Sequence, residues 1–415
     1  MARRSSPAGD LFGLERERKI ADSGIRNIFT PHQPISEVDL LFGRQTEVQK
    51  LIETLNTPGQ HVLLYGERGV GKSSLANVVA TLLRLMLDIK LYVKRCDQSD
   101  TFESILLRPL ADVGADLTLT QLDTQVDTKL GADIKVLRGE RAKSVMASYA
   151  AHHVLSPSTV AEAIAEIDAL LVVDEADAIG NLADRRKLAE MIKLLSDSGA
   201  KFKVMIVGIA GIGGELTAAH PSVQRCLRET KLERMSNAEL EQIVATGSQK
   251  AGLIFSRGVI NAIVSLSAGY PHFTHLIALK CAEQAVGEDR KNIDETHLKD
   301  ALVLAVKDAE GTLKREYDDA TRSFATEMYA DIVAAAATLL TEEFNASSLR
   351  EAIESRVGMP ISQGSLNNYL QRLVSDDGST ILQRTAKGVY RFSDPRMSSF
   401  ARMNTLMVAV PSSWL

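Results

Sequence analysis

The chain alternates between short runs of apolar residues and longer segments whose apolar residues recur at helical spacing. Runs that are continuously or largely apolar lie at His61–Tyr65, Ile89–Arg95, Ala169–Val173 and Phe202–Gly208, and a fifth strand is predicted at Lys231–Arg234. Strands of a parallel sheet have this character because helices cover both of their faces. The alternation across residues 39–236 therefore predicts an α/β core built on a parallel sheet.

The regions around this core have different patterns. Residues 1–38 contain charges and turn residues that break any sustained period, so we expect an N-terminal arm with room for one short helix. A long segment at about 116–159 interrupts the core, and the alternation in Thr128–Val136 predicts an inserted β-hairpin. Residues 237–310 have a helical pattern throughout, with four helices expected to start near Asn237, Ser256, Pro271 and Asp294.

The remaining region, residues 311–415, begins with a charged connector at Lys314–Arg322. Three helices are predicted after it, at Phe324–Leu340, Ser347–Arg356 and Leu366–Val374, with Asn345 as the cap of the second helix. A β-ribbon is expected at Ile381–Arg384 and Gly388–Phe392. This order of elements is typical of a winged helix.

The clearest chemical motif follows the first apolar run. Gly66, Glu67, Arg68, Gly69, Val70, Gly71, Lys72 and Ser73 match the pattern GxxxxGK[ST] in full, and the helical run that starts at Ser74 follows directly. Glycines let backbone amides approach a phosphate group, and a helix that starts there directs its free N–H groups at the phosphate oxygens. Lys72 would neutralise the β/γ-phosphate charge and the Ser73 hydroxyl would ligate Mg²⁺, so the motif predicts an ATP site.

A second motif follows the third apolar run. Leu170–Val173 is followed by two carboxylates, Asp174 and Glu175. Adjacent carboxylates repel each other unless a cation offsets their charge, and a bound Mg²⁺·ATP would supply one. Asp174 would then lie in the Mg²⁺ shell and Glu175 would activate the attacking water, so the pair predicts an ATP hydrolase. The alternative is a solvated acidic turn at the end of a strand.

Composition and charge bear on whether the chain binds nucleic acid or a membrane. Hydrophobic residues make up 45% and charged residues 24% of the 415 residues, and the net charge is −5. Such a chain has no global attraction to nucleic acid, so any contact with DNA needs a local patch. Cys96, Cys226 and Cys281 are isolated and fit a reducing compartment. Because no signal-peptide pattern and no spanning apolar segment is present, we expect a cytoplasmic protein without membrane contact.

In this order, the motifs resemble the AAA+ ATPases of the origin-recognition initiator clade and the neighbouring STAND-type and transposition-regulator ATPases. Besides Gly66–Ser73 (the Walker A motif) and Leu170–Glu175 (the Walker B motif), the resemblance rests on Leu41–Arg44 with Glu47, on His220–Arg225, and on Gly269–His272 in the helical region. It extends from about Asp39 to Phe400 and includes the winged helix. It implies an α/β AAA+ P-loop core, a helical lid over residues 237–310 and ATP with Mg²⁺ as ligands.

The resemblance also implies roles for single residues. Phe42, Gly43 and Arg44 would line the adenine pocket, where Pro271 would pack on the base. Arg225, with Arg228 as a substitute, would reach the γ-phosphate held by a neighbouring subunit of a homo-oligomer. His272 occupies the lid position where initiators have an arginine, although His272 and His275 also fit ordinary core or cap positions.

One departure from the family pattern concerns the fourth apolar run. It leads into Gly208-Ile209-Ala210-Gly211, where these ATPases have a polar sensor residue. Together with the histidine at the lid position, this departure predicts slow hydrolysis and a nucleotide-controlled switch.

The C-terminal region decides between two functional classes. From Thr321 to Leu415 we count nine Lys/Arg and nine Asp/Glu, so the region is neutral. A thin DNA footprint is nevertheless available in Asn367, Asn368 and Arg372 of the third helix and Arg384, Lys387 and Arg391 of the ribbon. The first hypothesis is therefore an ATP-dependent assembly that acts on double-stranded DNA. The alternative is a STAND-like signalling or defence ATPase that oligomerises with ATP to recruit an effector protein.

Overall fold

The computed structural model describes residues 13–35, 41–113, 156–209, 221–309, 311–323, 326–339, 341–374 and 380–408. The hairpin predicted at Thr128–Val136 lies outside these residues. The chain divides into two units. One comprises Ile52–Leu63 and Leu83–Thr230, and the other comprises Met1–Leu51, Leu64–Leu82 and Lys231–Leu415.

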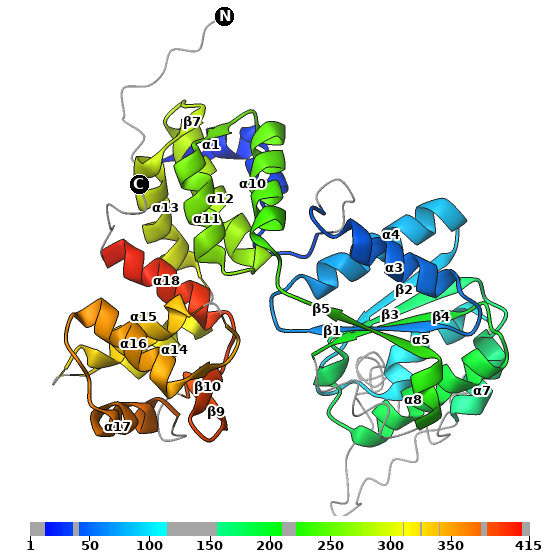
Figure 1. Ribbon diagram of the computed structural model, residues 1–415. Helices are drawn as coiled ribbons and strands as arrows, with labels where there is room; N and C mark the ends of the chain where they lie inside the picture. The colour runs from blue at the N-terminus through cyan, green and yellow to red at the C-terminus, as the bar shows by residue number, and fades with distance from the viewer. Residues whose placement is uncertain are drawn as a thin grey trace, which may run out of the picture. The chain divides into compact units, whose positions relative to one another are not determined.

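A five-stranded sheet forms the centre of the α/β core. Its strands are β1 (His61–Gly66), β2 (Lys90–Arg95), β3 (Ala169–Asp174), β4 (Lys203–Gly208) and β5 (Leu227–Leu232). Their order is β2-β3-β4-β1-β5 (Figure 1). The β2–β3 and β3–β4 pairs are parallel, with Leu171 opposite both Tyr92 and Val204. Every residue of β3, an interior strand of the sheet, is buried, which explains its continuously apolar sequence and confirms the predicted α/β fold.

The fifth strand was predicted at Lys231–Arg234, and this position is wrong by several residues. The strand runs from Leu227 to Leu232, and only these two end residues are buried. Its middle carries the polar side chains of Arg228, Glu229 and Lys231. Because β5 is the last strand in the sheet order, its polar middle is tolerated, and no continuous apolar run marked it.

Helices flank this sheet, and their starts are marked by caps. α5 (Phe102–Asp112), α7 (Pro157–Ile164) and α8 (Leu182–Asp197) lie together on one side of the sheet (Figure 1). The side chains of Thr101, Ser156 and Asn181 accept hydrogen bonds from backbone amides in their first turns. α3 (Gln45–Asn56) precedes β1, and α4 (Lys72–Leu87) follows it.

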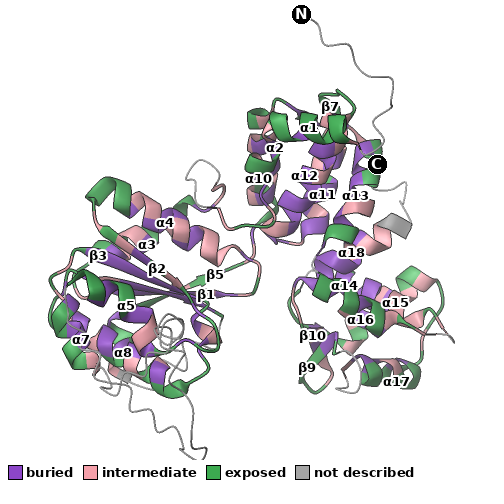
Figure 2. Cartoon of the chain, turned by 180° about the vertical axis from the view of Figure 1, so that it is seen from behind, coloured by how far each residue is buried: buried purple, intermediate pink, exposed green. Residues whose placement is uncertain are grey.

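The helical region begins with four helices at the expected positions. They are α10 (Asn237–Ala251), α11 (Arg257–Ser267), α12 (Pro271–Gly287) and α13 (Glu295–Asp308). Capping boxes formed by Ser236 and Asp294 fix the starts of α10 and α13. α12 is buried along most of its length (Figure 2). A parallel pair of two-residue strands, β6 (Ile254–Phe255) and β7 (Asn292–Ile293), was not predicted because segments this short have no measurable period.

The N-terminal segment is not a free arm in its described part. It forms α1 (Leu14–Ser23) and α2 (Ile25–Ile28), which pack on α10 and α12. Ile25 and Phe29 are fully buried. A Cβ on Gly247 of α10 would lie 2.4 Å from the Phe29 ring, so only glycine fits at that position. The prediction missed this packing because Gly24, with φ 71°, separates the two helices and interrupts the apolar period.

The C-terminal segment, which extends from α14 to α18 (Gly311–Val408), contains two helices that were not predicted from the sequence. The charged connector is α14 (Gly311–Thr321), which buries Leu313, Tyr317 and Ala320. α18 (Met397–Val408) ends the described chain and packs on α13, α14 and α15.

Between α14 and α18 the chain follows the predicted order of elements. α15 (Met328–Thr338), α16 (Ala346–Val357) and α17 (Gln363–Val374) are accompanied by β8 (Phe344–Asn345), β9 (Leu382–Ala386) and β10 (Val389–Phe392). These strands form a sheet in the order β8-β10-β9, and Asn345 caps α16 as expected. In the part of the chain that the structure describes, no helix combines the length and the apolar character needed to cross a bilayer.

The buried histidine of α12 predicts acid sensitivity. The Nδ1 atom of His275 accepts a hydrogen bond from the Thr30 amide, and burial, followed by the charge of His272, lowers the pKa of His275 to about 4. Between pH 6.5 and 4 the unfolded chain therefore binds a proton that the folded chain excludes. Stability should fall as the pH falls through this window, by at most about 1.4 kcal/mol per pH unit for this residue.

A His275→Asn variant offers an amide oxygen near the Nδ1 position and has no group that titrates in this range. Its urea midpoint should depend less steeply on pH between 6.5 and 4 than that of the unmodified chain. His32→Asn, at an exposed position, is the matched control and should leave the dependence unchanged. Equal slopes for His275→Asn and the unmodified chain would contradict the prediction.

Candidate nucleotide-binding site

The loop between β1 and α4 has a backbone that only glycine adopts easily. Gly69 and Gly71 have φ values of 87° and 98°, in the left-handed region that disfavours side chains. A Cβ on Gly66 would lie 2.4 Å from the carbonyl oxygen of Leu232 in β5, so a side chain has no room there. Val70 is buried and anchors the loop. This backbone, followed at once by a helix N-terminus, fits a phosphate group.

Lys72 is the first residue of α4 and lies against the loop that it follows. Its Nζ atom donates to the carbonyl oxygens of Gly66, at 3.1 Å, and Glu67, at 2.7 Å. The ammonium group is therefore close to the loop backbone, where the charge of a bound phosphate would be. The next helical residues include Ser74, whose hydroxyl accepts a hydrogen bond from the Ile35 amide at 3.1 Å.

The carboxylate of Glu67 has two partners from the helical region. It accepts hydrogen bonds from Arg234, at 2.9 and 3.2 Å, and from the Tyr270 hydroxyl, at 2.5 Å. The Arg234 guanidinium also lies 4.9 Å from the centre of the Tyr270 ring. Burial alone would raise the pKa of Glu67, but the hydrogen bonds from Arg234 and Tyr270 outweigh it and lower the pKa. Sequence reasoning missed these partners, which lie 167 and 203 positions away along the chain.

The start of α12 lies directly beside the phosphate loop. Tyr270 is fully buried at the N-cap, and Pro271 is the first helical residue. The Cγ atom of Pro271 is 3.7 Å from the point where a Cβ on Gly71 would lie. His272 contacts the N-terminal segment, since its Nδ1 atom lies 2.7 Å from the Pro31 carbonyl oxygen. Pro271, at the start of α12, therefore lies within van der Waals reach of the loop at Gly71.

In the other unit, the end of β3 presents the predicted acidic pair. Asp174 is buried, and its carboxylate accepts a hydrogen bond from the Glu175 amide at 2.9 Å. The Arg95 guanidinium lies 3.8 Å from the same carboxylate. Glu175 is exposed and has φ 55° and ψ 39°, a left-handed conformation that is uncommon outside glycine. Strained residues of this kind concentrate at functional sites.

A protein-family model described as novel STAND NTPase 1 matches residues 33–279, which is well over half of the chain. The chain belongs to the novel STAND NTPase 1 family. The matched region of this STAND NTPase contains the phosphate loop, the acidic pair and the lid as far as α12.

Solved structures that align along most of this STAND NTPase include a Walker-type ATPase of Pyrococcus abyssi. Its identity is 18% and its TM-score 0.49, and the match covers 90% of this chain and 99% of that one. The ORC2 protein of Aeropyrum pernix, in its ADPNP and ADP complexes, aligns at 15% identity and a TM-score of 0.49, covering 93% and 98%. The ORC1 protein of the same organism, in complex with DNA, aligns at 15% identity and a TM-score of 0.47, covering 93% and 97%. No curated protein matches the chain.

The Phe42–Arg44 segment of this STAND NTPase is attached to the lid. Phe42 packs against an apolar cluster of Met235, Leu240, Ile243 and Val264. Gly43 has φ 73°, and a Cβ there would lie 2.7 Å from the Glu239 side chain. Arg44 is only 5% exposed, and its guanidinium binds Glu47, at 3.1 Å, and the Glu233 carbonyl oxygen, at 2.6 Å. The guanidinium of Arg44 therefore makes its hydrogen bonds to groups of the protein itself.

The end of β4 has a partner that the sequence did not indicate. The Asp177 carboxylate, in the 3-10 turn after β3 (Ala176–Ala178), accepts a hydrogen bond from the Ile209 amide at 3.0 Å. The described end of β4, Gly208 and Ile209, carries no polar side chain, and its last amide is bound by Asp177. Ala210 and Gly211 lie outside the described residues.

Arg225 ends a 3-10 turn (Pro221–Arg225), and its side chain is exposed. Its carbonyl oxygen accepts a hydrogen bond from the Gln60 side chain at 2.9 Å, which fixes the backbone. Within the described ranges, no carboxylate forms a salt bridge with its guanidinium. Arg228 is also exposed, on β5.

The candidate DNA-contact residues lie on α17 and on the ribbon formed by β9 and β10. Asn367 and Asn368 are exposed on α17, but Arg372 on the same helix donates to the Arg322 carbonyl oxygen and lies 4.2 Å from the centre of the Tyr329 ring. On the ribbon, Arg391 pairs with Gln383 and Tyr390 pairs with Arg384. Adjacent strand residues point to opposite faces, so this register separates the side chains of Arg384 and Arg391. Lys387 is exposed in the turn between the two strands.

Proposed function

We propose that this STAND NTPase is a switch that binds ATP and hydrolyses it slowly. The observation that carries the proposal is the glycine-dependent loop of Gly66–Ser73 with the lid residue Pro271 beside Gly71. The loop residues and Ser74 would bind the phosphates, and Lys72 would turn from the loop carbonyls to the β/γ-phosphate oxygens. Phe42, Gly43, Arg44, Pro271 and His272 would surround the base side of the nucleotide.

The metal in this proposal is Mg²⁺, bound by the Ser73 hydroxyl and the Asp174 carboxylate. Both are oxygen donors, which Mg²⁺ prefers in proteins. When bound, the ion would offset the charge of the β- and γ-phosphates. Glu175, exposed at the end of β3, would orient and deprotonate the attacking water. Turnover would be slow because Ile209, at the end of β4, has an apolar side chain that cannot form a hydrogen bond with the γ-phosphate.

Replacing Lys72 by Ala tests nucleotide binding. The variant should lose detectable binding of a fluorescent ATP analogue, because it lacks the cation that neutralises the β/γ-phosphates. Arg257→Ala, which removes an exposed lid arginine paired with Glu241, is the control and should bind normally. Unaltered affinity in Lys72→Ala would reject the proposed site.

We further propose that ATP is shared between copies of the chain, with Arg225 reaching the γ-phosphate of a neighbour. The support is the exposed position of Arg225 on a backbone fixed by Gln60, and the fixed, permanently charged fork of an arginine. Such a site is incomplete in one copy, so hydrolysis depends on assembly.

Mixing two inactive variants tests this sharing. Arg225→Ala should bind ATP but hydrolyse it far more slowly, since arginines acting in trans contribute roughly 10³–10⁵ in rate in other P-loop systems. Glu175→Gln should bind ATP without hydrolysing it, because the amide cannot accept the water proton. An equimolar mixture should recover part of the ATPase activity, because some interfaces contain both intact groups. No recovery, with turnover per chain independent of protein concentration, would make the chain a monomeric switch.

The C-terminal segment is the output module in this proposal. The order helix, strand, helix, helix, strand, strand over residues 328–392 supports a winged helix. In the first form of the proposal this module binds double-stranded DNA through α17 and the ribbon. In the alternative it contacts an effector protein. The engagement of Arg372 with Tyr329 and the separation of Arg384 from Arg391 favour the protein-contact form.

A charge-removal experiment separates the two forms. If the module binds DNA, changing Arg384, Lys387 and Arg391 together to Ala should weaken binding to duplexes of any sequence. The log–log salt slope should fall by about 0.9 for each phosphate that the variant no longer neutralises. The control removes equal charge from the exposed lid residues Arg290, Lys291 and Lys299. DNA affinity is measured by fluorescence anisotropy. If both triple variants weaken DNA binding equally, or if neither does, the DNA-binding form is rejected and the effector form remains.

A further inference from the structure

A carboxylate, a guanidinium and a phenol from three distant parts of the chain meet beside the phosphate loop. Glu67 lies in the loop, Arg234 follows β5, and Tyr270 caps α12. The side chains of Glu67 and Arg234 are 19% and 24% exposed, and Tyr270 is fully buried. Hydrogen bonds among partly buried charged groups are stronger than those between neutral groups in water. The cluster is thus a defined contact between the loop and the lid.

Arg234 and the lid turn behave as one piece of structure. The amide of Met235, next to Arg234, donates to the carbonyl oxygen of Gly269 at 2.9 Å. Gly269 has φ 87°, and a Cβ there would lie 2.7 Å from the Arg234 Cβ. This packing fixes the Gly269–Pro271 turn to the chain that leaves β5. Glu67 is the loop residue that joins this piece through side-chain hydrogen bonds.

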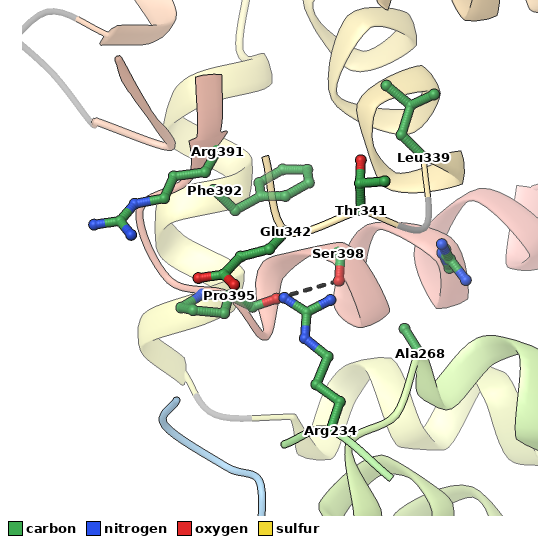
Figure 3. Close-up of a pocket in the computed structure, with 10 residues that line it drawn as sticks. Arg234, Ala268, Leu339, Thr341, Glu342, Arg391, Phe392, Pro395 and Ser398 are labelled. Atoms are coloured by element: carbon green, nitrogen blue, oxygen red, sulfur yellow. Dashed lines mark hydrogen bonds between the residues drawn. The ribbon is translucent and has the colours of Figure 1, made fainter. Parts of the chain in front are cut away.

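The cluster also reaches the C-terminal segment. Figure 3 shows the Arg234 side chain extending into a pocket that is lined by Glu342, Pro395 and Ser398, among others. At the loop itself, a Cβ on Gly69 would lie 2.9 Å from the Arg396 side chain. Arg234 therefore lies where the loop, the lid and the C-terminal segment come together.

A glutamate beside a phosphate site needs an explanation. An ionised carboxylate repels a polyphosphate, and this repulsion is strong where solvent is partly excluded. The guanidinium of Arg234 neutralises the carboxylate, and the two-point hydrogen bond directs it toward the lid. Glu67 is then useful as a tether for the lid turn, whereas it would be harmful as a free charge.

We propose that Glu67 is a positioning residue: through Arg234 and Tyr270 it holds the Gly269–Pro271 turn against the phosphate loop and so sets the affinity for ATP. This inference rests on the proposed nucleotide site. In it, Glu67 acts on the nucleotide through the lid turn, which places Pro271 beside Gly71. Losing the tether releases the turn and leaves the backbone of the loop in place.

The test compares single variants with a charge exchange. Glu67→Ala and Arg234→Ala should each weaken binding of a fluorescent ATP analogue on the order of tenfold or more, as expected when a hydrogen bond between charged groups is removed. Glu67→Arg alone should also bind weakly, because it sets two guanidinium groups against each other. The double variant Glu67→Arg, Arg234→Glu restores an opposite-charge pair and should recover most of the affinity. Tyr270→Phe removes only the hydroxyl donor and should lose a few-fold.

Hydrogen exchange supplies a second measurement, which an altered direct contact with the nucleotide would not change. In the unmodified chain, ATP should protect the backbone amides of residues 268–275. Glu67→Gln, which keeps an acceptor for Tyr270 but loses the charge, should bind ATP at a saturating concentration with reduced protection there. The lid control Arg257→Ala, away from this cluster, should show full protection.

The outcomes separate this inference from the nucleotide site on which it rests. Normal binding in Lys72→Ala would reject the site itself. Loss of binding in Lys72→Ala with normal binding in Glu67→Ala would reject only the tether. A charge exchange that binds as weakly as Glu67→Arg alone would also overturn the tether, and it would indicate direct contact between Glu67 and the nucleotide. Thermal melting of each variant identifies any that fails to fold. If a single variant does not fold, the charge-exchange double variant and the hydrogen exchange of Glu67→Gln decide whether the tether exists.

Discussion

The phosphate loop is confined between a strand and a lid, and this confinement determines much of the structure around it. On one side, the Gly66 backbone approaches the Leu232 carbonyl of β5 so closely that no side chain fits. On the other side, Gly71 faces Pro271 of α12. The chain runs from β5 through Arg234 into α10, so the strand that confines the loop also leads into the lid. A displacement of the loop would therefore also displace β5 at Leu232 and α12 at Pro271, since packed interiors transmit strain.

The confined loop and its sheet were predictable because their residues are dictated by burial and backbone geometry. β3 and β4 are buried on both faces and have continuous apolar sequences, and caps such as Ser236 and Asp294 mark the lid helices. Elements that depend on tertiary contacts were not predictable. β5 has a polar middle at the end of the sheet order, α1 and α2 are separated by Gly24, and the charged sequence of α14 hides a face that packs on α15 and α18.

In the candidate site, too, some residues were predictable from the sequence, whereas the contacts between distant residues were not. Gly66–Ser73 and the Asp174–Glu175 pair follow local patterns, in which a strand must deliver the motif to the edge of the sheet. Glu67 belongs to the same loop, yet its partners Arg234 and Tyr270 come from segments 167 and 203 positions away. The hydrogen bond from the Ile209 amide to Asp177 spans 32 positions and also has no local signature. A single sequence shows which groups can act in a site, but their pairing depends on the fold.

The N-terminal segment joins the lid to the helix that follows the phosphate loop. The Thr30 amide and the Pro31 carbonyl bind His275 and His272 of α12, and the Ile35 amide binds Ser74 at the start of α4. α4 follows the loop, the loop is bound to the lid through Glu67, and the lid carries the two histidines. The family match begins at residue 33, inside this segment, and ends at residue 279, inside α12. The matched region therefore contains the Ile35–Ser74 contact, whereas Thr30 and Pro31 lie just before it and α14–α18 lie beyond it. Arg234 and Gly69, both inside the matched region, nevertheless lie against Pro395, Arg396 and Ser398 beyond it, so the loop and the lid are packed against a segment outside the family match.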